Sequence, residues 1–248
     1  MTGSQHLVHG LHAVQAALNR PELTIRGVWV EQGRRDRRMA AVLAACAERG
    51  LTVQRVDRRE LDRLSGGAAH QGVVIDCPPM PAGDEVGLER LLDGLHGDPF
   101  LLVLDQVQDP HNLGACLRTA DAAGVQAVIT TRDRAAGLTP VVHKVASGAT
   151  RSVPFIQVTN LARTLDRLRQ RGIWLVGAAG DAPTLVHALD LKGPLAVVMG
   201  AEGGGLRRLT RERCDHLAKI PMVGTVESLN VSVATGVMLF EALRQRLV

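Results

Sequence analysis

The sequence predicts an α/β protein with two domains: a small α/β domain at the N-terminus, and a larger domain built on a mostly parallel sheet with helices on both faces. Short apolar runs alternate with segments of helical periodicity along most of the chain, which is typical of this class. Two of the later runs, 101–104 and 195–199, are apolar at every position, as in strands that are buried on both faces. An acidic stretch with four prolines and four glycines, residues 78–99, separates the two domains.

Residues 1–77 form the first predicted domain. Leu11, Val14 and Leu18 have helical spacing, and Pro21 ends the helix that they predict. The expected order is a helix at 6–19, a strand at 27–32, a helix at 37–50, a strand at 51–56, a helix at 57–64 and a strand at 71–77. A chain of about 75 residues is long enough to fold alone.

Residues 78–99 are interpreted as a linker with one short amphipathic piece, and residues 100–248 as the second domain. The predicted strands of this domain are at 101–104, 125–130, 152–158, 174–179, 195–200 and 218–222. Its predicted helices are at 112–123, 140–149, 160–171, 206–214 and 229–247. Such alternation implies a mostly parallel sheet, in which ligands bind at the carboxyl ends of the strands.

The composition is that of a globular protein in a reducing compartment. The net charge of +4 favours a polyanionic partner, although solubility alone accounts for so modest a charge. Aromatic residues make up only 2% of the chain, which argues against RNA binding through many stacked aromatics. No apolar run is long enough to span a bilayer, so we predict a cytoplasmic protein with no membrane partner. The cysteines lack the paired spacing of zinc or redox sites: Cys46, Cys77, Cys116 and Cys214.

Two polar clusters of the first domain have alternative interpretations. His6, His9 and His12 recur every three residues, but no carboxylate lies at ligand spacing, and we expect no metal site there. The Arg34–Arg38 cluster is either a solvated face or a contact for phosphate groups.

Three loops of the second domain, each following an apolar strand, are rich in glycine or polar residues. The first, within 101–124, breaks at Asp109-Pro110 and continues as a helix, for which Asn112 is interpreted as the N-cap. Arg118 follows in that helix, among residues that otherwise have the pattern of a packed face. The second loop lies in VVMGAEGGGL at 197–206 and the third in IPMVGTVESLNVS at 220–232. Three such loops in one parallel sheet indicate a single site.

The glycine-rich loop does not fit the common nucleotide-binding patterns. Glu202 stands where the Rossmann pattern needs its second glycine, and Leu206 where a Walker loop needs lysine. A carboxylate among glycines disfavours phosphate, so the ligand there is expected to be neutral or cationic. A serine hydrolase is excluded because the chain has no G-x-S-x-G elbow.

Together, the three loops resemble the motifs of the SpoU family of SPOUT RNA methyltransferases. The matching residues are Asp109, Pro110, Asn112, Leu113, Gly114, Arg118, Thr119 and Ala120 in the first loop, Gly200, Glu202, Gly205 and Leu206 in the second, and Ile220, Pro221, Met222, Gly224, Ser228, Leu229, Asn230, Ser232 and Ala234 in the third.

The resemblance implies methyl transfer from S-adenosylmethionine to a ribose 2′-hydroxyl, without a metal. The implied catalytic residues are Asn112, Arg118, Glu202, Ser228 and Asn230, and the implied cofactor-binding residues are Gly200, Ile220 and Leu229. An arginine side chain keeps its proton at neutral pH, so we interpret Arg118 as a group that holds a phosphate and stabilises the oxyanion rather than as a base.

The resemblance also implies a trefoil knot in the C-terminal part and a homodimer. The apolar residues of the last helix are either the dimer face or core: Val233, Val237, Leu239, Phe240 and Leu243. HGLHAV at 9–14 and HQGVV at 70–74 resemble the ribosomal-protein-like substrate domain of the branch that methylates large-subunit rRNA. The predicted substrate is therefore RNA rather than DNA, namely a guanosine in 23S rRNA. The alternatives are a tRNA ribose methyltransferase and a catalytically silent RNA-binding or assembly factor.

Overall fold

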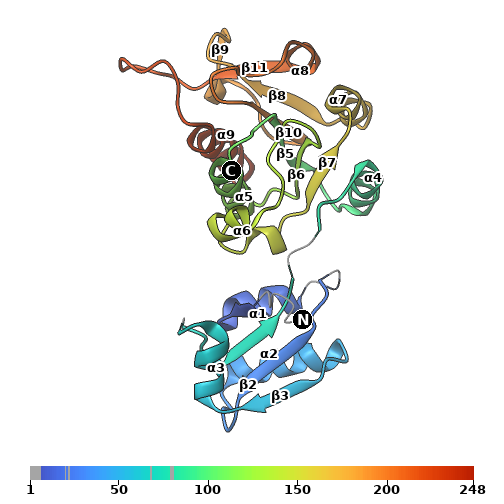
Figure 1. Ribbon diagram of the computed structural model, residues 1–248. Coiled ribbons are helices and arrows are strands. Elements are labelled where there is room, and N and C mark those ends of the chain that lie inside the picture. The colour runs from blue at the N-terminus through green and yellow to red at the C-terminus, as the bar shows by residue number, and fades with distance from the viewer. Residues whose placement is uncertain (1–6, 20, 22, 68, 79–80) are drawn as a thin grey trace. The chain divides into compact units, whose positions relative to one another are not determined.

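The computed structural model describes residues 7–19, 21, 23–67, 69–78 and 81–248. The chain divides into two compact units, Met1–Met80 and Pro81–Val248, and both contain helices and strands (Figure 1). The segment interpreted as a linker, residues 78–99, holds a helix of the second unit, α4 (Glu85–Gly94), in which Leu88 and Leu92 are buried. Gly83, just before α4, donates its backbone N–H to the carbonyl of Phe155 of the same unit at 2.8 Å.

The first unit is a four-stranded sheet with three helices. Its elements are β1 (Leu7–His9), α1 (Leu11–Leu18), β2 (Gly27–Glu31), α2 (Arg37–Glu48), β3 (Val53–Val56), α3 (Arg58–Ser65) and β4 (Val73–Asp76). The strand order is β1-β4-β2-β3, with β2 and β3 parallel and the other pairs antiparallel. Val28, Val30, Val42 and Cys46 belong to the core between the sheet and helices α1 and α2.

The predicted helix at 6–19 is wrong in its first turn. Residue 6 lies outside the described residues, and 7–9 form strand β1, which pairs with β4. Gly10 then has a φ of 92°, a left-handed backbone that a helix cannot contain, so α1 begins only at Leu11. The spacing of Val14 and Leu18 predicted the helix correctly, but it said nothing about where the helix starts.

The second unit contains a seven-stranded, fully parallel sheet with the order β7-β6-β5-β10-β8-β11-β9. Its strands are β5 (Phe100–Asp105), β6 (Ala127–Thr131), β7 (Phe155–Val158), β8 (Trp174–Ala178), β9 (Thr184–Leu185), β10 (Leu195–Gly200) and β11 (His216–Lys219). The helices after α4 are α5 (Pro110–Ala122), α6 (Pro140–Val145), α7 (Leu161–Gln170), α8 (Arg208–Arg213) and α9 (Val231–Arg246). Two short 3₁₀ helices, Ala149–Arg151 and Val186–Ala188, complete the unit.

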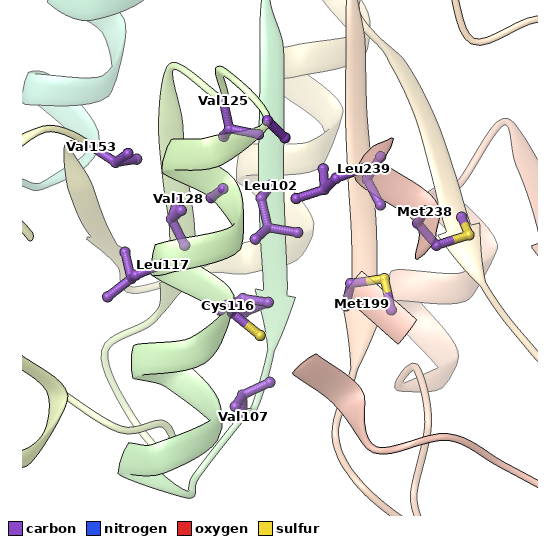
Figure 2. Packing of buried hydrophobic residues seen from close by; sticks show 14 of the residues in the cluster. Leu102, Val107, Cys116, Leu117, Val125, Val128, Val153, Met199, Met238 and Leu239 are labelled. Atoms are coloured by element: carbon purple, nitrogen blue, oxygen red, sulfur yellow. The ribbon is translucent and has the colours of Figure 1, made fainter. Parts of the chain in front are cut away.

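Helices cover both faces of this sheet. Successive residues of a strand point to opposite sides, so each strand packs against both layers of helices. Leu102 and Leu104 pack in a cluster with residues of α5, α6 and α9, and Figure 2 shows part of it, with Cys116, Leu117 and Met238. Leu101 and Val103 pack on the other side with α4 and α7. The apolar runs at 101–104 and 195–199 therefore predicted doubly buried strands correctly.

All four cysteines are free, and burial raises the pKa of the Cys116 thiol to about 11 and that of Cys214 to about 12. Among the described residues, no group of His, Cys, Asp and Glu is placed to hold a metal ion. None of the helices in that part is long and apolar enough to cross a membrane.

Candidate active site

The three loops leave the sheet at the same edge, because β5, β10 and β11 are parallel and each loop follows the carboxyl end of its strand. A cavity of about 670 Å³ lies there. Six of the eight sequence-predicted site residues line it: Gly200, Glu202, Ile220, Ser228, Leu229 and Asn230. A second cavity of about 600 Å³ lies around Trp174, at the amino end of β8, and contains none of the predicted residues.

Asn230 joins the three loops through its side chain. Its amide nitrogen Nδ2 donates to Oδ1 of Asn112 at 3.0 Å and to Oε1 of Glu202 at 2.7 Å. Its amide oxygen caps α9 by accepting from the backbone N–H of Ser232 at 2.9 Å. Both donors and the acceptor of the amide are therefore used, and its orientation is fixed.

The role of Asn112 differs from the prediction. Asp109 caps α5, since its carboxylate accepts from the backbone N–H of His111 at 2.8 Å, and Pro110 occupies the first turn, where no N–H is needed. Asn112 therefore lies inside the helix, 8% exposed, with its side chain bonded to Asn230 instead of the helix end. The interpretation of Asn112 as an N-cap was wrong.

The glycine loop after β10 is held in a tight turn. Ala201 and Gly205 pair through two backbone hydrogen bonds, of 3.2 and 2.9 Å, and Glu202 lies in the turn between them. Gly203 and Gly205 have φ angles of 74° and 61°, which favour glycine. A Cβ at Gly200 would lie 2.1 Å from the carbonyl carbon of Gly205, so only glycine fits where the loop folds back.

Asp105 anchors the base of this loop, a role that the sequence analysis missed. This aspartate ends β5 and is fully buried. Its carboxylate accepts from the backbone N–H of Arg207 at 3.0 Å and from Nε of the same arginine at 2.6 Å. A buried carboxylate needs hydrogen-bond partners of this kind, because it is not solvated. The bonds between Asp105 and Arg207 therefore hold the end of the glycine loop against β5. In the sequence, the signal for this role is a charged residue directly after the fully apolar run at 101–104.

Arg118 does not line the cavity of its own chain. It is exposed on α5 and makes no hydrogen bond or ion pair within the described residues. The neighbouring side chain of Thr119 lies beside α9, with its Cγ2 3.7 Å from the position of a Cβ built on Gly236. Arg118 is thus the one predicted catalytic residue that the structure does not bring to the other four.

Both units of the chain match models of known protein families. Residues 99–240 match the model of the SpoU rRNA Methylase family, and residues 7–81 match a model described as RNA 2'-O ribose methyltransferase substrate binding. The chain is 54% identical to the 23S rRNA (guanosine-2'-O-)-methyltransferase RlmB of Pseudomonas syringae pv. tomato, over 96% of this chain and 95% of that protein.

Two solved structures of the family have the same fold. The SpoU methyltransferase AviRb from Streptomyces viridochromogenes, in complex with the cofactor AdoMet, matches with a TM-score of 0.69 and 26% identity over 97% of this chain and 90% of its own. The TrmH/SpoU tRNA modifying enzyme of A. aeolicus matches with a TM-score of 0.56 and 31% identity, but covers only 66% of this chain and 84% of its own. With a family model matching 99–240 and a relative 54% identical over nearly its whole length, this chain belongs to the SpoU rRNA methylase family.

Proposed function

We propose that this protein transfers a methyl group from S-adenosylmethionine to the ribose 2′-hydroxyl of a guanosine in 23S rRNA, in the cytoplasm. The observation that carries the proposal is the junction of Asn112, Glu202 and Asn230, one residue from each loop, beside the 670 Å³ cavity. The identity to a 23S rRNA enzyme over 96% of the chain supports this substrate. The tRNA enzyme of A. aeolicus covers only 66% of the chain, which favours rRNA over tRNA.

The residues of the cavity fit S-adenosylmethionine. Gly200 and its neighbours supply backbone groups, and Ile220 and Leu229 supply apolar surface suited to a flat adenine. The lining carries two carboxylates, Glu202 and Glu227, and one lysine, Lys219, and this negative balance favours a ligand with positive charge. When bound there, S-adenosylmethionine supplies the methyl group on a positively charged sulfur.

The protein side chains orient the ribose and stabilise the charge that develops on its oxygen. Asn230 holds Glu202 in place, and we assign the second oxygen of Glu202, together with the Ser228 hydroxyl, to orienting the substrate. Arg118 binds a phosphate beside the target ribose and stabilises the ribose oxyanion while the proton of the hydroxyl passes to solvent water. A guanidinium group keeps its proton at neutral pH and is therefore a poor base.

We propose a homodimer that brings Arg118 of one protomer to the cavity of its partner. Of the five apolar residues predicted as dimer face or core, Leu239 is fully buried and Leu243 half-buried. Val233, Val237 and Phe240 are 52%, 38% and 48% exposed and share one face of α9 at helical spacing. Exposed apolar patches of this kind mark interfaces. Arg118 lies near this face, since Thr119 contacts α9.

A Phe240→Asp variant is expected to be monomeric and to lose methyl transfer, since a charge in the apolar contact opposes association and separates Arg118 from the cavity of the partner. Light scattering coupled to size exclusion measures the mass. Val86→Asp is the matched control, because Val86 is a 56% exposed residue of α4, on the other side of the sheet. A monomeric wild-type protein with full activity would contradict the dimer.

The substrate is tested by mapping 2′-O-methyl groups in RNA from cells that lack the gene. We expect one guanosine of 23S rRNA to lose its methyl group and to regain it when the gene is restored. Unchanged 23S rRNA together with a lost site in tRNA would replace the rRNA proposal by the tRNA alternative.

The trefoil knot stays a prediction from the resemblance.

A further inference from the structure

Six exposed arginines of the first unit come from two segments of the chain: Arg35, Arg37, Arg38, Arg55, Arg58 and Arg59. We call them the arginine patch. The sequence analysis identified only the cluster at 34–38, and left open whether it is a solvated face or a phosphate contact. The structure adds a second group of arginines, at the end of β3 and the start of α3.

The two segments leave the sheet side by side. β2 and β3 are parallel neighbours, with Glu31 opposite Val56, so their carboxyl ends lie at the same edge. The pairing continues one residue further, because the backbone N–H of Gln32 donates to the carbonyl of Val56 at 2.8 Å. The segments that lead from β2 into α2 and from β3 into α3 therefore begin side by side at this edge.

The positive charge of this edge is not neutralised by its own carboxylates. Segments 32–38 and 55–59 contain seven arginines and two aspartates, whereas the rest of 1–77 contains four arginines and six acidic residues. Both aspartates are engaged as helix caps: Asp36 accepts from the backbone N–H groups of Arg38 and Met39, and Asp57 from that of Glu60 at 2.8 Å. Asp36 also pairs with Arg34.

The guanidinium groups of the patch make no hydrogen bond or ion pair within the described residues, in contrast to those of Arg49 and Arg63 in the same unit. Arg49 donates to the carbonyls of Ala17, Leu18 and Leu23, and Arg63 pairs with Glu60 at 2.6 Å. Those two guanidinium groups stabilise the fold, whereas the six of the patch are available for a ligand. Exposed single arginines are common, but six at one edge of a sheet create a local electrostatic field.

We propose that the arginine patch binds the phosphate backbone of the rRNA substrate and anchors it while the target ribose reacts at the second unit; this inference rests on the proposed function. Guanidinium groups bind phosphate oxygens in pairs of hydrogen bonds, and such contacts position a nucleic acid without reading its sequence. An acidic protein partner fits less well. The described residues of the first unit include no large exposed hydrophobic side chain, although the centres of protein interfaces need them.

The test compares two double variants with the same change in net charge. Arg35→Ala with Arg58→Ala removes one arginine from each segment of the patch. Arg26→Ala with Arg90→Ala is the matched control, because Arg26 is exposed before the amino end of β2 and Arg90 is exposed on α4. The dissociation constant for 23S rRNA transcribed in vitro is measured at several salt concentrations, with thermal unfolding to check the fold.

We expect the patch variant to bind RNA at least about tenfold more weakly at 0.1 M salt. The slope of the logarithm of its association constant against the logarithm of the salt concentration is expected to become shallower by about 0.7 to 0.9 per lost phosphate contact. The control is expected to stay within about twofold. Unchanged RNA binding by the patch variant, or an equal loss in the control, would overturn the proposal. If wild-type protein binds rRNA in this manner but methylates no ribose, the proposed function fails while the patch stands.

Discussion

An Arg118→Ala variant is expected to lose methyl transfer by about 10²- to 10³-fold, the usual cost of removing one group that stabilises a developing oxyanion. Its stability and its affinity for S-adenosylmethionine are expected to stay near the wild-type values. Arg118 is exposed, bonds to nothing in the described residues and does not line the cavity of its own chain. Surface substitutions of this kind change the free energy of unfolding by about 0.5 kcal/mol or less.

The experiment separates catalysis from binding. Single-turnover methyl transfer at saturating RNA and S-adenosylmethionine gives the rate, and calorimetry gives the affinity for the cofactor. Arg118→Lys keeps the charge but loses the planar fork, so an intermediate rate is expected. Arg163→Ala is the control, because Arg163 is another exposed arginine, in the first turn of α7. Full activity of Arg118→Ala would remove this residue from the mechanism, and lost cofactor binding would make its role structural.

Local patterns were enough to predict most of the fold. Fully apolar runs predicted strands β5 and β10 to within about a residue, because burial on both faces leaves no position for a polar side chain. The order of the strands could not be predicted, since it depends on contacts between distant segments. Strand β9 was missed, because the two residues Thr184–Leu185 are too few to show a period.

The candidate site was predictable in its composition but not in its connections. Parallel strands place their loops at one edge, so the convergence of the second and third loops on one cavity could be anticipated. The bond between Asn112 and Asn230 spans 118 positions, and a shift of the helix start from Asn112 to Pro110 decides whether it forms. The pair of Asp105 and Arg207 likewise joins residues 102 positions apart. Neither separation leaves a periodic signal in the sequence.

The close approach within the glycine loop makes Gly200 the most sensitive position of the site. A Cβ there would lie 2.1 Å from the carbonyl carbon and 2.3 Å from the carbonyl oxygen of Gly205. These atoms are backbone, so no side-chain rotation relieves the clash, and the loop has to open. Opening would separate Glu202 from Asn230 and pull Arg207 away from Asp105.

A Gly200→Ala variant is therefore expected to bind S-adenosylmethionine at least about tenfold more weakly and to lose methyl transfer, with a cost in stability of about 1 to 3 kcal/mol for the overpacked site. Gly204→Ala in the same loop is the matched control, because a Cβ at Gly204 would meet nothing within 4 Å. Calorimetric titration with S-adenosylmethionine and denaturant unfolding measure both variants. A weaker affinity of Gly200→Ala than of Gly204→Ala for S-adenosylmethionine would show that the loop shapes the cofactor site through this backbone contact. Equal affinities of the two variants would show that the cavity tolerates an open loop.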